Sequence, residues 1–303
     1  GAKVIVANPR PTRLEEVATH VVRYAYGDEA AVVRAFLPGQ DALVPDAVQA
    51  AAQAFSAAEN AVIFFGSEGL GLAESRVLAD ACAALLLETN HTGRLNNGLV
   101  GVWPKANLQG AFDLGFAPAD DLAGLLAEAG LVYIAGADPA GDDPALAEAL
   151  DGAEFVIVQE LFLTETARKA DLVLPVQSFI EREGSFTSGE RRVQRFYPAV
   201  APVPGPRPDF RITADLAQRL GHAVEGRAAA LVLLQIANEA PDYAGLSYPK
   251  LAAVHEQWPI VHREDLFYGG TSYHNRHGLG VQLPLRSSAD GAETGKNSDD
   301  APP

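Results

Sequence analysis

Three acidic residues near the middle of the chain are the first candidates for chemistry. Glu165, Glu181 and Glu183 lie close together in the sequence, and a carboxyl group serves as a general acid or base when its pKa suits the working pH. Each also has a structural alternative. Glu165 follows Thr164, which can cap a helix, and Glu181 and Glu183 flank Arg182 as in an ordinary ion-pair cluster. No Ser-His-Asp or Cys-His arrangement can be argued from the sequence, so we expect no catalytic residue.

The cysteine and histidine content predicts no metal centre. Cys82 is the only cysteine, so it forms no internal disulfide and cannot alone hold an iron–sulfur cluster, which takes about four ligands. It lies in an alanine- and leucine-rich helical run, where a small buried side chain is expected. His274 and His277 have helical spacing, but their surroundings are rich in glycine. No carboxylate or cysteine lies nearby to complete a tetrahedral site.

A glycine-rich loop at 66–71 follows a predicted strand and precedes a predicted helix. Backbone N–H groups at such a place attract anions. The spacing of Gly66, Gly69 and Gly71 is not that of a dinucleotide-binding fingerprint, Glu68 would repel a pyrophosphate, and the P-loop lysine is absent. We therefore expect close packing of the strand against the helix here.

Composition and charge narrow the class of protein. The chain has 303 residues, 48% of them hydrophobic, and a formal charge of −16, which favours two α/β lobes and argues against nucleic-acid binding. Arg191, Arg192 and Arg195 form the only tight basic cluster, and we expect it at a solvated or interface rim. No apolar run approaches the ~20 residues that cross a bilayer, and no leader for secretion opens the chain.

Short apolar segments alternate with helical patterns along the chain. Strands are predicted at 4–7, 61–65, 131–135, 155–158 and 172–174, and helices at 13–24, 45–58, 73–87, 144–150 and 209–220. Strands that are separated by helices form parallel βαβ units. The predicted class is therefore α/β and doubly wound, with mainly parallel sheets.

Changes in composition predict four segments. A loop-rich span at 93–118 ends the first lobe, and a proline-dense span at 198–208 is stiff and extended, as suits a strap. The last residues are polar and acidic, which is typical of disorder. The predicted segments are a first α/β lobe at 1–118, a second lobe at 119–197, a strap with a helical extension at 198–286, and a disordered acidic tail at 287–303.

The stretch 159–194 carries a family resemblance. It reads QELFLTETARKADLVLPVQSFIEREGSFTSGERRVQ and resembles the signature of the molybdopterin-dinucleotide oxidoreductase superfamily, roughly TETAxxADVVLP followed by ExxGTFTNxEGRVQ. This superfamily includes formate dehydrogenases, nitrate reductases and the large iron–sulfur subunit of NADH–quinone oxidoreductase (complex I). The resemblance implies two Rossmann-like lobes of the molybdopterin-oxidoreductase type, but its members share the fold and not the chemistry.

Two loops carry the resemblance further. The opening VIVANPRPTRL is similar to the VIDPRRT loop of the family, and 131–139 is similar to its xxGxNP loop. In relatives that carry the cofactor both loops approach the pterin dinucleotide, so the resemblance implies Asn8, Arg10, Gly136 and Asp138 as vestigial contacts. Asn8 replaces the usual Asp and Asp138 the usual Asn. An anion would then face a polyanionic ligand and weaken its binding.

A second segment resembles one branch of the superfamily. TGRLNNGLVGVWPKANLQGAFDLG at 92–115 is similar to the phrase TGHVGRPNNGLLGVWPxANxQGAWDLG of the large iron–sulfur subunit of complex I, and 269–273 and 278–280 resemble the C-terminal end of that subunit. The resemblance implies a non-catalytic, degenerate structural domain of the peripheral arm of complex I, which supports electron transfer from NADH to quinone.

That resemblance also implies cofactors, partners and location. No cofactor is expected in this chain, and the iron–sulfur clusters are expected only in an upstream segment. The expected partners are the flavin- and cluster-bearing NADH-oxidising subunits, on the cytoplasmic side of the bacterial inner membrane and without a membrane span.

Two alternatives stay open. The chain can be a fragment of a molybdenum or tungsten bis-pterin oxidoreductase such as a formate dehydrogenase, with molybdopterin dinucleotide as its cofactor and the acidic candidates as acid or base. It can also be a free-standing nucleotide-binding α/β protein. Trp103, in the span between the lobes, is either a packing anchor or an interface hot spot, and we favour packing.

Overall fold

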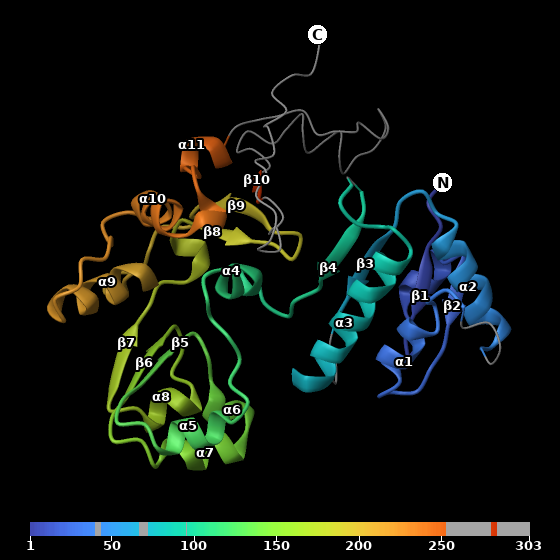
Figure 1. Ribbon diagram of the computed structural model, residues 1–303. Coiled ribbons are helices and arrows are strands. Elements are labelled where there is room, and N and C mark those ends of the chain that lie inside the picture. Colours follow the sequence, from blue (N-terminus) through green and yellow to red (C-terminus); the bar gives the residue numbers. More distant parts are fainter. Residues whose placement is uncertain (40–43, 67–71, 95, 253–279, 284–303) are drawn as a thin grey trace, which may run out of the picture. The chain divides into compact units, whose positions relative to one another are not determined.

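The computed structural model describes residues 1–39, 44–66, 72–94, 96–252 and 280–283. They divide into two compact units (Figure 1). Unit 1 comprises Gly1–Leu122 with Thr187–Glu190, and unit 2 comprises the rest of the chain from Ala123. The predicted tail at 287–303, most of the glycine loop at 66–71 and the histidines at 274 and 277 lie outside the described residues.

Unit 1 is built on two pairs of parallel strands. β1 (Ile5–Ala7) pairs with β2 (His20–Val22), and β3 (Val62–Phe65) pairs with β4 (Gly98–Gly101). The helices are α1 (Glu29–Arg34), α2 (Asp46–Ser56), α3 (Leu72–Glu88) and α4 (Leu108–Asp113). The buried core residues are Val22, Phe36, Val48, Ala51 and Leu85. Strands and helices therefore enclose one apolar core, as βαβ units require.

The predicted helix at 13–24 is wrong. The structure has a short 3-10 helix, η1 (Arg13–Val17), and then strand β2. The valines that suggested a helical face are β-branched and pack well in strands. Val22 is 1% exposed, and its burial beside β1 favours the strand. The span at 93–118, predicted as loop, also contains β4 and α4.

Unit 2 contains a sheet of three parallel strands in the order β5–β6–β7. They are β5 (Val132–Ala135), β6 (Val156–Glu160) and β7 (Leu172–Pro175). The helices α5 (Leu122–Ala127), α6 (Pro139–Asp142), α7 (Pro144–Leu150) and α8 (Glu165–Lys169) gather beside this sheet in Figure 1. Buried residues of the sheet, including Val132, Ile134 and Val158, form a core with Leu126, Leu150 and Ala167 of the helices.

The remainder of unit 2 has its own core. Its elements are η2 (Phe179–Glu181), β8 (Gly184–Thr187), β9 (Arg192–Phe196), α9 (Asp209–Arg219), α10 (Ala229–Glu239), η3 (Pro241–Tyr243), α11 (Tyr248–Leu251) and β10 (Val281–Gln282). The core residues include Val193, Leu233, Tyr243 and Leu251. The proline-rich span lies beside the end of the β5–β6–β7 sheet. There the Gln177 N–H donates to the Arg207 carbonyl at 3.0 Å.

These pairings confirm the predicted α/β class with mainly parallel sheets. Among the described strands, β10 pairs antiparallel with β9 and departs from that rule. Within the same residues, no helix combines the length and the apolar character that crossing a membrane requires.

Candidate cofactor-binding loops

The predicted contact residues fall into two loops, one in each unit. Asn8 and Arg10 follow β1 in unit 1, and Gly136 and Asp138 follow β5 in unit 2. Each loop leaves the carboxyl end of a parallel strand, which is where open α/β sheets bind ligands. The structure therefore brings the four residues together as two pairs, and each pair has its own surroundings.

The loop after β1 is shaped by short-range hydrogen bonds. The Arg10 N–H donates to Asn8 Oδ1 at 3.1 Å, which is an Asx turn, and Arg23 Nη1 donates to the Asn8 carbonyl at 2.7 Å. Arg23 also binds Glu15 at 2.7 Å, and this bond, more than any other, holds the pKa of Glu15 below its usual range. Arg10 is exposed. The Arg23 guanidinium is therefore held by Glu15 and the Asn8 carbonyl, and the exposed Arg10 is the residue of this loop whose charge suits an anionic ligand.

The loop after β5 begins with a glycine that the backbone requires. Gly136 has φ of 64°, in the left-handed region, where a residue with a side chain is strained. A Cβ atom on it would meet nothing within 4 Å, so conformation and not space demands glycine. Its N–H donates to the Gln159 carbonyl at 3.0 Å. The chain thus turns away at the strand end while it stays bonded to β6.

Asp138 turns its carboxylate onto donors of its own chain. Its Oδ1 accepts from the Thr166 N–H at 2.8 Å, the Thr166 hydroxyl at 2.6 Å and the Gly141 N–H at 3.3 Å. The Thr166 hydroxyl in turn accepts from the Ala140 N–H at 2.9 Å. These bonds, the one from the Thr166 hydroxyl foremost, lower the pKa of Asp138. The carboxylate braces α6 against α8, and these donors stabilise its charged form.

A buried polar side chain in β6 was missed by the sequence reasoning. Gln159 is 1% exposed. Its Oε1 accepts from the Tyr133 hydroxyl, and its Nε2 donates to Asp209 Oδ1 at 2.9 Å. Asp209 Oδ2 also binds Arg182 Nη2 at 2.9 Å. Burial raises the pKa of Tyr133. The sequence did contain a signal for this residue, because Gln159 directly follows the apolar run 155–158, where a buried side chain was expected.

Glu165 has a structural position at the start of α8. Thr164 caps this helix, since its hydroxyl accepts from the Ala167 N–H at 3.1 Å, and the predicted cap is confirmed. The Glu165 side chain is 67% exposed and lies 3.4 Å from Arg168. Its contact in the structure is therefore the ion pair within its own helix.

The other two acidic candidates bind separate partners. Glu181 accepts from the backbone N–H groups of residues 178 and 203, both at 2.8 Å. Glu183 binds Arg195 at 2.7 Å. The expected cluster around Arg182 is wrong, because Arg182 pairs with Asp209 and not with its sequence neighbours. Both carboxylates therefore hold the chain in place.

Cys82 is buried in unit 1, as predicted, and the half-buried Trp103 packs against aromatic rings of the same unit, which is the favoured alternative. Cys82 is 1% exposed, and burial raises the pKa of its thiol to about 11. Trp103 meets Phe65 and Phe112 edge-on, with ring centroids 5.9 and 5.5 Å apart, and donates to Gln109 at 3.1 Å. In the described part of the chain, no three His, Cys, Asp or Glu side chains are grouped to hold a metal ion.

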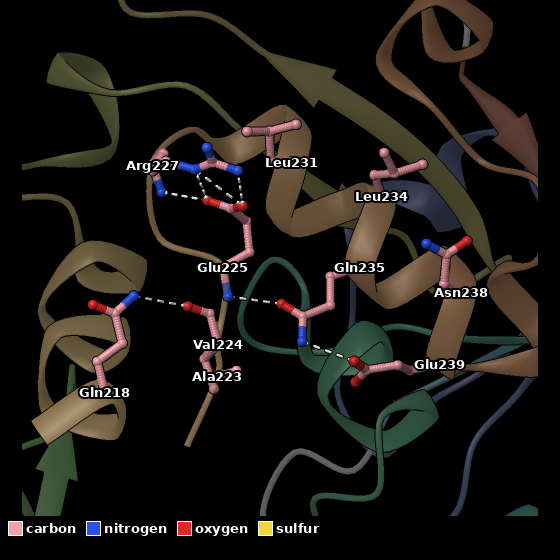
Figure 2. Close-up of a pocket in the computed structure, with 10 residues that line it drawn as sticks. All are labelled: Gln218, Ala223, Val224, Glu225, Arg227, Leu231, Leu234, Gln235, Asn238 and Glu239. Atoms are coloured by element: carbon pink, nitrogen blue, oxygen red, sulfur yellow. Dashed lines mark hydrogen bonds and ion pairs between the residues drawn. The ribbon is translucent and has the colours of Figure 1, made fainter. Parts of the chain in front are cut away.

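Unit 2 also has a cavity of ≈ 730 Å³ between α9 and α10, drawn in Figure 2. Glu225 and Arg227 form an ion pair across 2.9 Å at its edge, and the hydrogen bonds from Arg227 lower the pKa of Glu225 to about 2. The Glu225 N–H donates to Gln235 at 2.7 Å. None of the predicted contact residues lines this cavity, and its polar groups chiefly close the loop before α10.

Comparison with known proteins identifies relatives. Residues 34–219 match the family model described as molybdopterin oxidoreductase. The chain is 32% identical over 256 residues to F420-dependent formate dehydrogenase 2 subunit alpha of Methanococcus maripaludis, covering 71% of this chain and 37% of that protein. It is 28% identical over 266 residues to formate dehydrogenase H of Escherichia coli, covering 75% and 37%. The chain thus spans little more than a third of these relatives.

A solved structure supports the fold. Acetylene hydratase from Pelobacter acetylenicus superposes with a TM-score of 0.60 over 82% of this chain and 46% of that chain. The two sequences are 15% identical, so the similarity shows the architecture alone. It agrees with the mixed α/β arrangement of the two units.

These relatives correct one expectation and leave another without support. The expectation of no cofactor in this chain is contradicted by the match to the molybdopterin oxidoreductase family and by the formate dehydrogenases. The expectation treated the Asp138 carboxylate as turned toward a ligand, whereas in the structure it accepts hydrogen bonds from Thr166 and Gly141 of its own chain. The family resemblance itself is confirmed, whereas these relatives do not support the finer assignment to complex I.

Proposed function

Since this chain belongs to the molybdopterin oxidoreductase family, we propose that it is part of a molybdenum- or tungsten-dependent formate dehydrogenase. The observation that carries this is the 32% identity to a formate dehydrogenase alpha subunit over 71% of the chain. Because the chain covers 37% of that relative, the activity belongs to a longer polypeptide or assembly. The bound pterin group would supply the redox-active metal centre.

The role of this chain would be to bind and orient the pterin dinucleotide. Gly136 offers backbone close to the strand end with no Cβ in the way, and Arg10 offers an exposed guanidinium for a phosphate oxygen. Asp138 would not contact the ligand but would hold its loop through Thr166. Cys82 would not serve the metal, because it is 1% exposed. Each unit thus offers one loop suited to a dinucleotide.

The full-length protein, purified with its native cofactor, tests this function. We expect stoichiometric molybdenum or tungsten by elemental analysis, a fluorescent pterin after oxidation, and formate-dependent reduction of a dye. Arg10→Gln should lower the pterin content several-fold, because one charge-assisted hydrogen bond to phosphate is lost. Arg13→Gln, an exposed arginine in the same segment, is the matched control. Wild-type protein without metal and without pterin would overturn the proposal.

A second function rests on one segment of the sequence. Residues 92–115 resemble the large iron–sulfur subunit of complex I, and this segment packs in unit 1 around Trp103, with Asn107 accepting from the Thr187 N–H at 2.9 Å. The chain would then work in the peripheral arm with flavin- and cluster-bearing NADH-oxidising subunits. Affinity purification of the full-length protein separates the two readings, since recovery of those subunits with NADH-dependent quinone reduction would favour complex I. The relatives favour formate dehydrogenase.

A further inference from the structure

The central strand of the unit 2 sheet contains a residue that its surroundings do not favour. Strands in parallel sheets are usually continuous apolar runs, and β6 begins accordingly with Val156, Ile157 and Val158. The next residue is Gln159, whose side chain is as deeply buried as those of the valines. A buried amide costs free energy unless it is hydrogen-bonded. Successive side chains alternate between the two faces of a strand, so Gln159 lies on the face opposite Val156 and Val158 and outside their core. An apolar side chain could be buried there without hydrogen bonds, so packing alone does not explain glutamine.

Gln159 lies where two loops leave the sheet. It is the register partner of Ala135, the last residue of β5, and its carbonyl accepts from the Gly136 N–H at 3.0 Å. One residue later β6 itself ends, at Glu160. The backbone of Gln159 therefore fixes the start of the loop after β5, and its position fixes the start of the loop after β6.

The side chain of Gln159 is bonded at both ends of its amide. Tyr133, in β5, donates its hydroxyl to Oε1, and Nε2 donates to Asp209 at the start of α9 at 2.9 Å. Asp209 is held in turn by Arg182 at 2.9 Å. Hydrogen bonds fix direction as well as distance, and low dielectric strengthens them. Four segments distant in sequence are thereby held in one arrangement at this end of the sheet.

From this geometry we propose that Gln159 is a positioning residue for the dinucleotide loop of unit 2. Its amide holds β5 and β6 in register at their ends and ties them to α9, so that Gly136 and the loop it begins keep one conformation. The inference rests on the proposed function, because the ligand that benefits is the pterin dinucleotide. Gln159 itself need not touch that ligand, since it acts through the Gly136 loop.

The test compares cofactor retention in two glutamine variants of the full-length protein with its native cofactor. Gln159→Leu keeps the volume and removes both side-chain bonds, and we expect the rate of pterin loss on dilution to rise roughly tenfold. Gln177→Leu is the matched control, because Gln177 is half-buried in the same unit and its side chain donates to the Pro206 carbonyl at 3.3 Å, whereas its backbone bond to Arg207 is unaffected by the change. Its rate should change less than about twofold.

Thermal unfolding of the cofactor-free protein separates positioning from a general loss of fold. Pterin loss that rises in Gln159→Leu while the unfolding temperature stays close to that of Gln177→Leu supports positioning. Equal pterin retention in the two variants overturns the inference and leaves the proposed function standing. Wild-type protein without any pterin overturns the proposed function instead.

Two milder variants keep the inference testable if Gln159→Leu does not fold. Tyr133→Phe removes only the hydroxyl and should raise the rate of pterin loss about threefold, and an unchanged rate counts against the inference. Gln159→Glu places a carboxylate beside Asp209, whose charge raises the pKa of the new group. Pterin retention should then be better at about pH 6 than at about pH 8, relative to wild type. A ratio that does not vary with pH contradicts the inference.

Discussion

The loops after β1 and β5 are each shaped by a hydrogen bond to a short polar side chain, but the sequence separation of the bonded residues differs greatly. In unit 1, Asn8 accepts a hydrogen bond from Arg10, two residues away. In unit 2, Asp138 accepts from Thr166, 28 residues away. Both are short polar residues just beyond the carboxyl end of a parallel strand. The first loop therefore takes its shape from neighbouring residues, whereas the second takes it from a helix that the next strand must first bring into place.

This difference teaches what each loop depends on. The Asx turn at Asn8 needs only a short stretch of backbone and forms wherever local sequence allows. The Asp138 brace needs α8, which is fixed by β6 and β7 on either side. A change far from Asp138 in sequence can therefore alter its loop. A change far from Asn8 in sequence should alter the loop after β1 less.

The largest effect is expected for Thr166→Val. Thr166 is fully buried, and the change removes a donor to Asp138 and the acceptor for the Ala140 N–H at almost equal volume. We expect the free energy of unfolding to fall by about 2 kcal/mol, measured by urea titration. The exposed control Thr92→Val should stay within about 0.5 kcal/mol of wild type. A Thr166→Val variant as stable as wild type would remove the contrast between the two loops.

The contribution of the charged Asp138 carboxylate to stability should depend on pH. The pKa of Asp138 is lowered from its ordinary value of 3.8, so its contribution to stability is present above that value and is lost as the pH falls through the lower, folded value. Asp138→Asn should therefore flatten the decline of the unfolding temperature below about pH 4. Asp120→Asn, at an exposed position, is the control. A decline as steep in Asp138→Asn as in wild type would show that the carboxylate is not stabilised by its donors.

Gly136→Ala should cost about 1 kcal/mol of unfolding free energy, because alanine is strained at φ of 64°. Gly130→Ala is the matched control, since a Cβ there meets only Glu154, at 3.9 Å. Urea titrations of both variants measure the difference. If Gly136→Ala cost nothing, the loop after β5 would be free to adopt another backbone conformation and the long-range brace would not define it.

The smallest effect is expected for Asn8→Ala, at about 0.5 kcal/mol. Only a local bond to Arg10 is lost, and the Arg23 bond to the Asn8 carbonyl does not depend on the side chain. Asn8→Asp keeps the acceptor and should behave as wild type in the same urea titration. A loss for Asn8→Ala as large as for Thr166→Val would mean that both loops depend on distant structure.

The parts of the fold that were predictable depend on local pattern. β5, β6 and β7 are apolar runs that end at glycine, a polar residue or proline, and the sequence therefore indicates them directly. Residues 17–22 carried valines at a spacing that fits a helix, and only pairing with β1, which the sequence does not display, made 20–22 a strand. The class of fold was predicted from the alternation of strands and helices along the chain. That prediction did not depend on the one helix that was wrong, at 13–24.

The candidate site was predictable only in part, for a similar reason. Gly136 and Asp138 were found through a family resemblance of a short loop. The role of Asp138 was not, because its partner Thr166 lies in another helix. Gln159 was missed entirely, since its bond to Asp209 joins residues 50 apart. Chemistry that depends on such distant pairs becomes visible only in three dimensions.

The order in which the chain is synthesised matters for unit 1. Thr187–Glu190 are counted with Gly1–Leu122, and within this set Thr187 donates to Asn107 at 2.9 Å, while a Cβ on Gly189 would lie 2.0 Å from the Gly101 carbonyl. Unit 1 is therefore complete only once residue 190 has been synthesised. The segments of β5, β6 and β7 are synthesised before that point, so the parallel sheet of unit 2 has all its strands before unit 1 has its last residues.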